Sequence, residues 1–111
     1  MVTPVEIGEA VETALSAGCT NLTLLKCTSS YPASPENANL VTMPLLGQTW
    51  GVNYGLSDHT MGTGVSVAAT ALGASVIEKH FIIDRSEGGV DSAFSLEPDE
   101  LMMLVRGIRN T

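Results

Sequence analysis

Apolar residues along the chain switch between helical spacing and short continuous runs, a pattern that predicts alternating helices and strands. Thr3 can cap a helix that Pro4 opens, and Gly18 supplies its stop. The run LTLLKC at residues 22–27 is short, apolar and bounded by turn residues, as expected for a strand buried on both faces. The first part of the chain is therefore predicted to be a helix over residues 4–17 followed by a strand.

Further helices and strands are predicted downstream in the same alternation. Pro44 should shorten or kink the next helix, because proline cannot donate the backbone hydrogen bond of a helix interior. Acidic residues in the first turn of the last helix favour its start through the helix dipole. The predicted elements are a helix over 37–50, a strand over 52–57, a helix over 62–73, a strand over 74–81 and a helix from Glu97.

This order of elements predicts the α/β class with parallel strands. Right-handed crossovers would place the three strands side by side, either in an open sheet or in an arc of a (β/α)8 TIM barrel. A complete barrel usually needs about 250 residues. The 111 residues of this chain could therefore supply less than half of one.

Charge and composition limit the partners. Twelve acidic against five basic residues give a formal net charge of −7, which leaves no broad basic surface for nucleic acid. No apolar run approaches the roughly 20 residues of a membrane span, and the acidic start is unlike a signal peptide. Cys19 and Cys27 are predicted to be reduced, buried thiols. We expect a soluble, cytoplasmic protein without nucleic-acid or membrane partners.

The second predicted strand ends in the polar sequence Ser57-Asp58-His59, where folds with parallel sheets place function. Strand alternation points Ser57 and His59 to one face and Asp58 to the other. A hydrolase triad is excluded, because neighbouring residues on a strand point in opposite directions. Asp58 is expected either to orient a neighbouring loop or histidine, or to be a solvated carboxylate.

The third predicted strand ends in Glu78-Lys79-His80, and alternation again puts the outer two residues together. If the two strands are neighbours, His59 and His80 can approach closely enough to bind one divalent metal ion and leave open positions for water and substrate. Taken alone, His59 is more often a structural or surface histidine. The convergence of the two histidines of the chain favours a metal site.

Two loops offer weaker candidates. Residues 28–32 follow the first strand with hydroxyl side chains, but serine and proline are ordinary turn residues. Residues 88–92 contain two glycines that allow close backbone approach to a ligand and an aspartate able to bind sugar hydroxyls. Neither loop is specific without further information.

The segments LLKCTSSYPASPENANL, YGLSDHTMG, ALGASVIEKHF and DRSEGGVDSAFSLEPDEL, with the spacings between them, resemble the sialic acid synthase family of phosphoenolpyruvate-dependent nonulosonate synthases. The resemblance covers nearly the whole chain. It implies that residues 1–111 are the C-terminal part of a synthase TIM barrel, its last three β/α units, without the C-terminal antifreeze-like domain. It also implies that the full-length enzyme is a homodimer.

The resemblance also implies a reaction and a set of site residues. C3 of phosphoenolpyruvate adds to the open-chain aldehyde of an acylamino sugar, water adds to the resulting cation, and phosphate is released by C–O cleavage. GGVDSAFSLEP looks most like the pseudaminic acid synthase branch. By resemblance, the catalytic residues are His59, His80 and Glu78, the two histidines hold Mn²⁺ or Mg²⁺, and the residues that bind phosphoenolpyruvate or sugar are Ser29, Tyr31, Ser57 and Asp91.

Two alternative hypotheses stay open at this stage. The chain could be a non-catalytic or self-associating barrel fragment, since unpaired barrel edges would expose apolar surface. It could instead be a small α/β module that binds a metal ion or phosphate and lacks the sugar chemistry. We expect the gene to continue upstream into further β/α units, which would separate these readings from the synthase.

Overall fold

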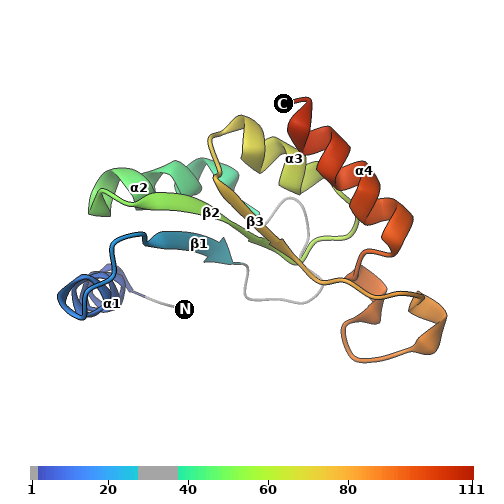
Figure 1. The fold of residues 1–111 in the computed structure, drawn as a ribbon, viewed down its shortest axis with the longest axis horizontal. Coiled ribbons are helices and arrows are strands. Elements are labelled where there is room, and N and C mark those ends of the chain that lie inside the picture. Colours follow the sequence, from blue (N-terminus) through green and yellow to red (C-terminus); the bar gives the residue numbers. More distant parts are fainter. Residues whose placement is uncertain (1–2, 28–37) are drawn as a thin grey trace.

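A computed structural model describes residues 3–27 and 38–111 of the chain. Helices and strands alternate along it, as the sequence predicts (Figure 1). The main elements are α1 (Pro4–Ser16), β1 (Thr23–Cys27), α2 (Met43–Trp50), β2 (Asn53–Asp58), α3 (Gly64–Ala71), β3 (Val76–Lys79) and α4 (Pro98–Arg109). Short 3-10 turns are found at η2 (Leu40–Thr42), η3 (Arg85–Glu87) and η4 (Ser92–Phe94).

The three strands form one parallel sheet in the order β1-β2-β3. Cys27 pairs with Ser57 across the first ladder, and Ser57 pairs with Glu78 across the second. The α/β class and the parallel neighbours predicted from the sequence are therefore confirmed. Because parallel neighbours run in the same direction, the carboxyl ends of all three strands lie along one edge.

The helix ends follow the chemistry of the sequence. Thr3 and Glu6 form a reciprocal capping box, with bonds of 3.2 Å in both directions. Gly18 then adopts a left-handed φ of 102°, which suits a residue without a β-carbon. Glu97 and Glu100 form a second capping box at the start of α4. These local signals explain why the predicted starts of both helices agree with the structure.

The core lies between the sheet and the helices that cover one of its sides. Leu56 of β2, Met43 of α2 and Ala69 of α3 are each 1% exposed or less and pack together. Ile77 of β3 packs against this group. Figure 1 shows α2, α3 and α4 on the same side of the sheet, and α4 contacts α3. Even-numbered β2 residues from Tyr54 to Asp58 thus face the helices, because side chains alternate along a strand.

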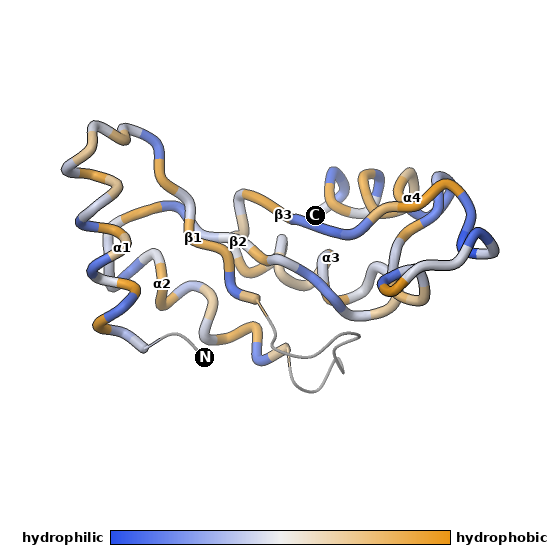
Figure 2. Tube along the Cα trace, turned by 90° about the horizontal axis from the view of Figure 1, so that it is seen from below, coloured by the Kyte–Doolittle hydropathy of each residue, from blue (hydrophilic) through white to orange (hydrophobic). Residues whose placement is uncertain are grey.

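The molecule is elongated, with principal extents of 44 × 31 × 28 Å. Figures 1 and 2 both place α1 and α4 at opposite ends of it. Hydrophilic and hydrophobic positions alternate along both helices (Figure 2). No helix within residues 3–27 and 38–111 is long and apolar enough to cross a membrane.

Three predictions about local structure were wrong. The helix predicted over 37–50 is not one helix within its described residues 38–50, because Asn39 takes a left-handed φ of 47° and α2 begins only at Met43. Strand β1 is only half-buried along most of its length. Neither cysteine forms a disulfide, but Cys19 is half-buried and Cys27 exposed, so the predicted burial of both thiols is not found. Cys27 is the last residue of β1, directly before residues that the structure does not describe.

Candidate functional site

The ends of β2 and β3 bring the predicted polar side chains together. Ser57 Oγ donates a 2.6 Å hydrogen bond to Glu78 Oε1, so these two side chains share a face of the sheet. Ser57 is 6% exposed, whereas Glu78 is exposed. The serine is thus fixed by its position in the ladder, and the carboxylate beside it is open to a ligand.

His59 and His80 follow directly after the two strands and lie side by side. Their ring centroids are 5.2 Å apart, with an angle of 60° between the ring planes. His59 is 6% exposed, and His80 is half-buried. Within residues 3–27 and 38–111, no group of three or more His, Cys, Asp and Glu side chains could hold a metal ion.

Each histidine has a polar side chain near its Nδ1 atom. Cys27 Sγ lies 3.7 Å from Nδ1 of His59, and Asp91 Oδ2 lies 3.8 Å from Nδ1 of His80. Burial, together with the nearby charge of His80, lowers the pKa of His59. The His59 imidazole is therefore neutral at pH 7, which is the form that binds metal ions.

Phe94 packs against both imidazoles, and the sequence reasoning missed it. Its ring centroid lies 5.2 Å from that of His80 and 6.0 Å from that of His59, in edge-to-face geometry. Phe94 is 3% exposed and belongs to the 3-10 turn η4. An aromatic residue within an otherwise small and polar loop was the available signal, since such a ring is expected to find a buried contact.

The opposite face of the same strand ends carries a buried ionic cluster, which we name the Asp58 cluster after its central carboxylate. Asp58 accepts hydrogen bonds from Thr60 N at 2.8 Å, Thr60 Oγ1 at 2.6 Å and Ser66 Oγ at 2.5 Å. Lys79 Nζ lies 3.2 Å from Asp58 Oδ2 and donates a 2.5 Å bond to the Thr60 carbonyl. Of the two roles considered for Asp58 from the sequence, that of a solvated carboxylate does not hold, because the side chain is buried. Asp58 lies on the face opposite Ser57, as alternation predicts.

Burial alone would raise the pKa of Asp58. The hydrogen bonds from Ser66 and Thr60 and the charge of Lys79 outweigh this effect and hold the pKa below its ordinary value. Asp58 is therefore ionised at neutral pH. The cluster joins the end of β2 to β3 and to α3, because Ser66 belongs to that helix.

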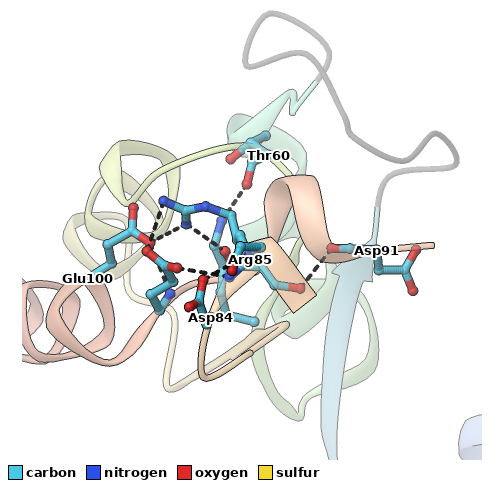
Figure 3. A network of polar contacts seen from close by, with 9 residues as sticks. Thr60, Asp84, Arg85, Asp91 and Glu100 are labelled. Atoms are coloured by element: carbon cyan, nitrogen blue, oxygen red, sulfur yellow. Dashed lines mark hydrogen bonds and ion pairs between the residues drawn. The ribbon is translucent and has the colours of Figure 1, made fainter. Parts of the chain in front are cut away.

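The segment between β3 and α4 returns past the strand ends. Leu96 N donates to the carbonyl of His80, and Ile82 N donates to the carbonyl of Leu96, both at 2.9 Å. Arg85 anchors this segment to α4 through ion pairs with Glu97 and Glu100. In Figure 3 the carboxylate of Asp91 points away from Arg85 and Glu100.

Two of the predicted binding residues, Ser29 and Tyr31, lie outside the described residues. The predicted residues that the structure brings together are His59, His80, Ser57, Glu78 and Asp91. They come from two strand ends and the segment after β3. This arrangement offers two imidazoles, two carboxylates and a hydroxyl at one edge of a parallel sheet, where such folds bind ligands.

The whole chain, residues 1–111, matches the family model described as the NeuB family. The chain belongs to the NeuB family. It is 42% identical over 111 residues to the pseudaminic acid synthase of Helicobacter pylori, covering 100% of this chain and 33% of that protein. It is 47% identical over 106 residues to the N,N'-diacetyllegionaminic acid synthase of Campylobacter jejuni, covering 94% of this chain and 32% of that one. The resemblance to the sialic acid synthase family is thereby confirmed.

Solved structures agree with this assignment. The N-acetylneuraminic acid synthetase of Leptospira borgpetersenii, solved in complex with citrate, superposes with a TM-score of 0.93 and 35% identity over 99% of this chain and 38% of that chain. A spore coat polysaccharide biosynthesis protein of Bacillus subtilis gives a TM-score of 0.92 and 39% identity, covering 98% of this chain and 31% of that one. The present chain spans about a third of the length of the curated relatives named above.

Proposed function

We propose that the chain contributes the last three β/α units of a TIM barrel that condenses phosphoenolpyruvate with the aldehyde of an acylamino sugar. The observation that carries the proposal is the approach of His59 and His80 to a ring-centroid distance of 5.2 Å at adjoining strand ends. Support comes from relatives that are named as synthases of pseudaminic and legionaminic acids.

The histidine pair fits one metal ion. Two imidazoles bound to one ion at about 2.1 Å put their ring centroids about 4.6 to 5.3 Å apart for ligand–metal–ligand angles of about 90° to 109°. The observed 5.2 Å lies within that interval. His59 and His80 would hold the ion, Mn²⁺ or Mg²⁺, while water and substrate would fill its other positions. A bound divalent ion would supply Lewis-acid polarisation of the sugar aldehyde.

The other side chains provide positioning and proton handling in this proposal. Ser57, held by its bond to Glu78, would contact phosphoenolpyruvate. The exposed carboxylate of Glu78 lies beside the serine and would orient or exchange a proton with the reacting groups. Asp91, 44% exposed at its side chain and 3.8 Å from Nδ1 of His80, would bind sugar hydroxyls. Ser29 and Tyr31 are kept in the proposal as ligands of phosphoenolpyruvate and sugar.

We assign the sugar specificity to the pseudaminic acid branch, on the GGVDSAFSLEP sequence that contains Asp91. Similarity to relatives does not separate the branches, since synthases of pseudaminic and legionaminic acids are 42% and 47% identical to this chain. Mass spectrometry of products formed from competing acceptor sugars tests the assignment. A preference for N-acetylmannosamine would overturn it.

Removal of one imidazole tests the metal site. Loss of an outer partner of a metal ligand already costs about 10- to 100-fold in affinity, so His59→Ala should weaken Mn²⁺ binding at least as much. Calorimetry on the full-length protein measures the dissociation constant. Glu12→Gln on α1 is the matched control, because it removes an exposed carboxylate far from the strand ends and reports nonspecific binding to the acidic surface. Unchanged affinity in His59→Ala would refute the ligand assignment.

A further inference from the structure

The Asp58 cluster touches the candidate site through the backbone. Asp58 directly precedes His59 and Thr60 directly follows it, and Lys79 directly precedes His80. Lys79 contacts both neighbours of His59, through Asp58 Oδ2 and the Thr60 carbonyl. The backbone on each side of His59 is therefore tied to the residue next to His80.

The register of the sheet strengthens this relation. Asp58 and Lys79 are paired positions of the β2–β3 ladder, and they are its last pair. The paired register of β2 and β3 ends there, so it does not fix the distance between the segments that follow the two strands. The first residue of each of these segments is a histidine. The ionic cluster lies at the point where the ladder ceases to set the spacing.

Stability alone does not explain a buried ion pair between Asp58 and Lys79 at the end of the β2–β3 ladder. The preceding residues on the same face, Leu56 and Ile77, are apolar and pack with the core. Buried ion pairs pay a large desolvation penalty, and apolar residues of similar volume often stabilise a fold equally well or better. Charged and hydroxyl groups differ from apolar ones in being directional, so they fix distances that apolar packing leaves adjustable.

We propose that Asp58 and Lys79 are positioning residues that set the separation of His59 and His80 from the opposite face of the sheet. The bonds to Thr60 fix the turn that follows His59, and the bond from Ser66 ties the same carboxylate to α3. The proposal rests on the proposed function only in treating the two histidines as a ligand pair. Its geometric content, the ring separation, stands on the contacts alone.

The test compares Asp58→Asn, Lys79→Met and the double variant Asp58→Asn/Lys79→Met in the full-length protein. Lys79→Met leaves a buried carboxylate without its cation and is the variant most prone to unfold, so the double variant, which removes both charges, is the decisive one. We expect its thermal midpoint to return close to that of the unmodified protein, while its Mn²⁺ dissociation constant stays raised by about 10- to 100-fold. A purely structural role predicts that affinity recovers together with stability.

A crystal structure of the double variant without metal gives a second readout. The separation of the His59 and His80 ring centroids should depart from 5.2 Å. Glu100→Gln is the matched control, since it breaks an ion pair with Arg85 that contacts neither histidine directly; it should leave Mn²⁺ affinity and ring separation unchanged. An unmodified ring separation together with full Mn²⁺ affinity in the double variant would overturn the proposal. Failure of the unmodified protein to bind Mn²⁺ would refute the proposed function instead, and the ring separation would still decide the positioning role.

Discussion

Replacement of Gly55 by alanine should force β2 and β3 apart. Gly55 pairs with Val76 in the ladder, and a β-carbon at Gly55 would lie 2.1 Å from the Val76 carbonyl oxygen and 2.9 Å from Leu25 Cδ2. An ordinary contact of a β-carbon is 3.4 Å or longer. The backbone of β3 would thus have to withdraw by about 1 Å, and a backbone cannot rotate away as a side chain can.

The expected cost follows from this overlap. Overpacking usually costs about 1–3 kcal/mol, and a clash with backbone belongs at the upper end, so Gly55→Ala should lower the free energy of unfolding by about 2–3 kcal/mol. Urea denaturation followed by circular dichroism measures the difference.

Gly64→Ala is the matched control for this experiment. Gly64 opens α3, and a β-carbon there would meet no heavy atom within 4 Å. Alanine has a higher helix propensity than glycine, so stability should stay the same or rise by up to about 1 kcal/mol. If the free energy of unfolding of Gly55→Ala stayed within about 0.5 kcal/mol of that of the unmodified protein, the close approach of β2 and β3 described above would be wrong.

Three further changes probe other parts of the fold. Leu56→Ala, at a core position 1% exposed, should lower the free energy of unfolding by about 2–5 kcal/mol in urea titrations. Thr3→Ala removes the capping hydroxyl of α1 and should cost about 1 kcal/mol in the same assay, with Thr3→Ser as the conservative control. The hydrogen bonds from Arg85 and from the Glu97 backbone lower the pKa of Glu100 from its ordinary 4.5. The stabilisation that ionised Glu100 provides is therefore fully present above pH 4.5 and is lost as the pH falls through the lower pKa of the folded state. Urea midpoints measured across the acid range should therefore fall less steeply in Glu100→Gln, and equal slopes would contradict the assigned role of this ion pair.

The strand ends could be predicted from the sequence because alternation on a strand is a local rule. It placed Ser57 with His59, and Glu78 with His80, before any tertiary contact was known, while the register of β2 and β3 decides that Ser57 meets Glu78 and Asp58 meets Lys79. The position of Phe94 could not be predicted in this way. It depends on the return of the chain to the strand ends through the bridge between Phe81 and Leu96, and periodicity carries no information about such a return.

Errors in the sequence reasoning arose where backbone geometry or neighbours at a distance decide the outcome. The left-handed φ of Asn39 delays the start of α2, although the composition of residues 37–50 suits a helix. The exposure of Cys27 depends on what covers the end of β1 and not on the apolar residues before it. Composition predicts that a residue can be buried, while coverage by other elements decides whether it is.

The spatial order of the strands equals their order along the chain. Each ladder therefore joins segments that leave the ribosome one after the other, and Ser57 and Glu78 are separated by only 21 positions. Because both ladders are parallel, each one requires a crossover to close before its hydrogen bonds form, which makes such pairing slower than local contacts. The imidazole pair is completed when β3 docks onto β2, and its aromatic support arrives later with Phe94, so a chain interrupted between these events would carry both histidines without the ring that packs against them.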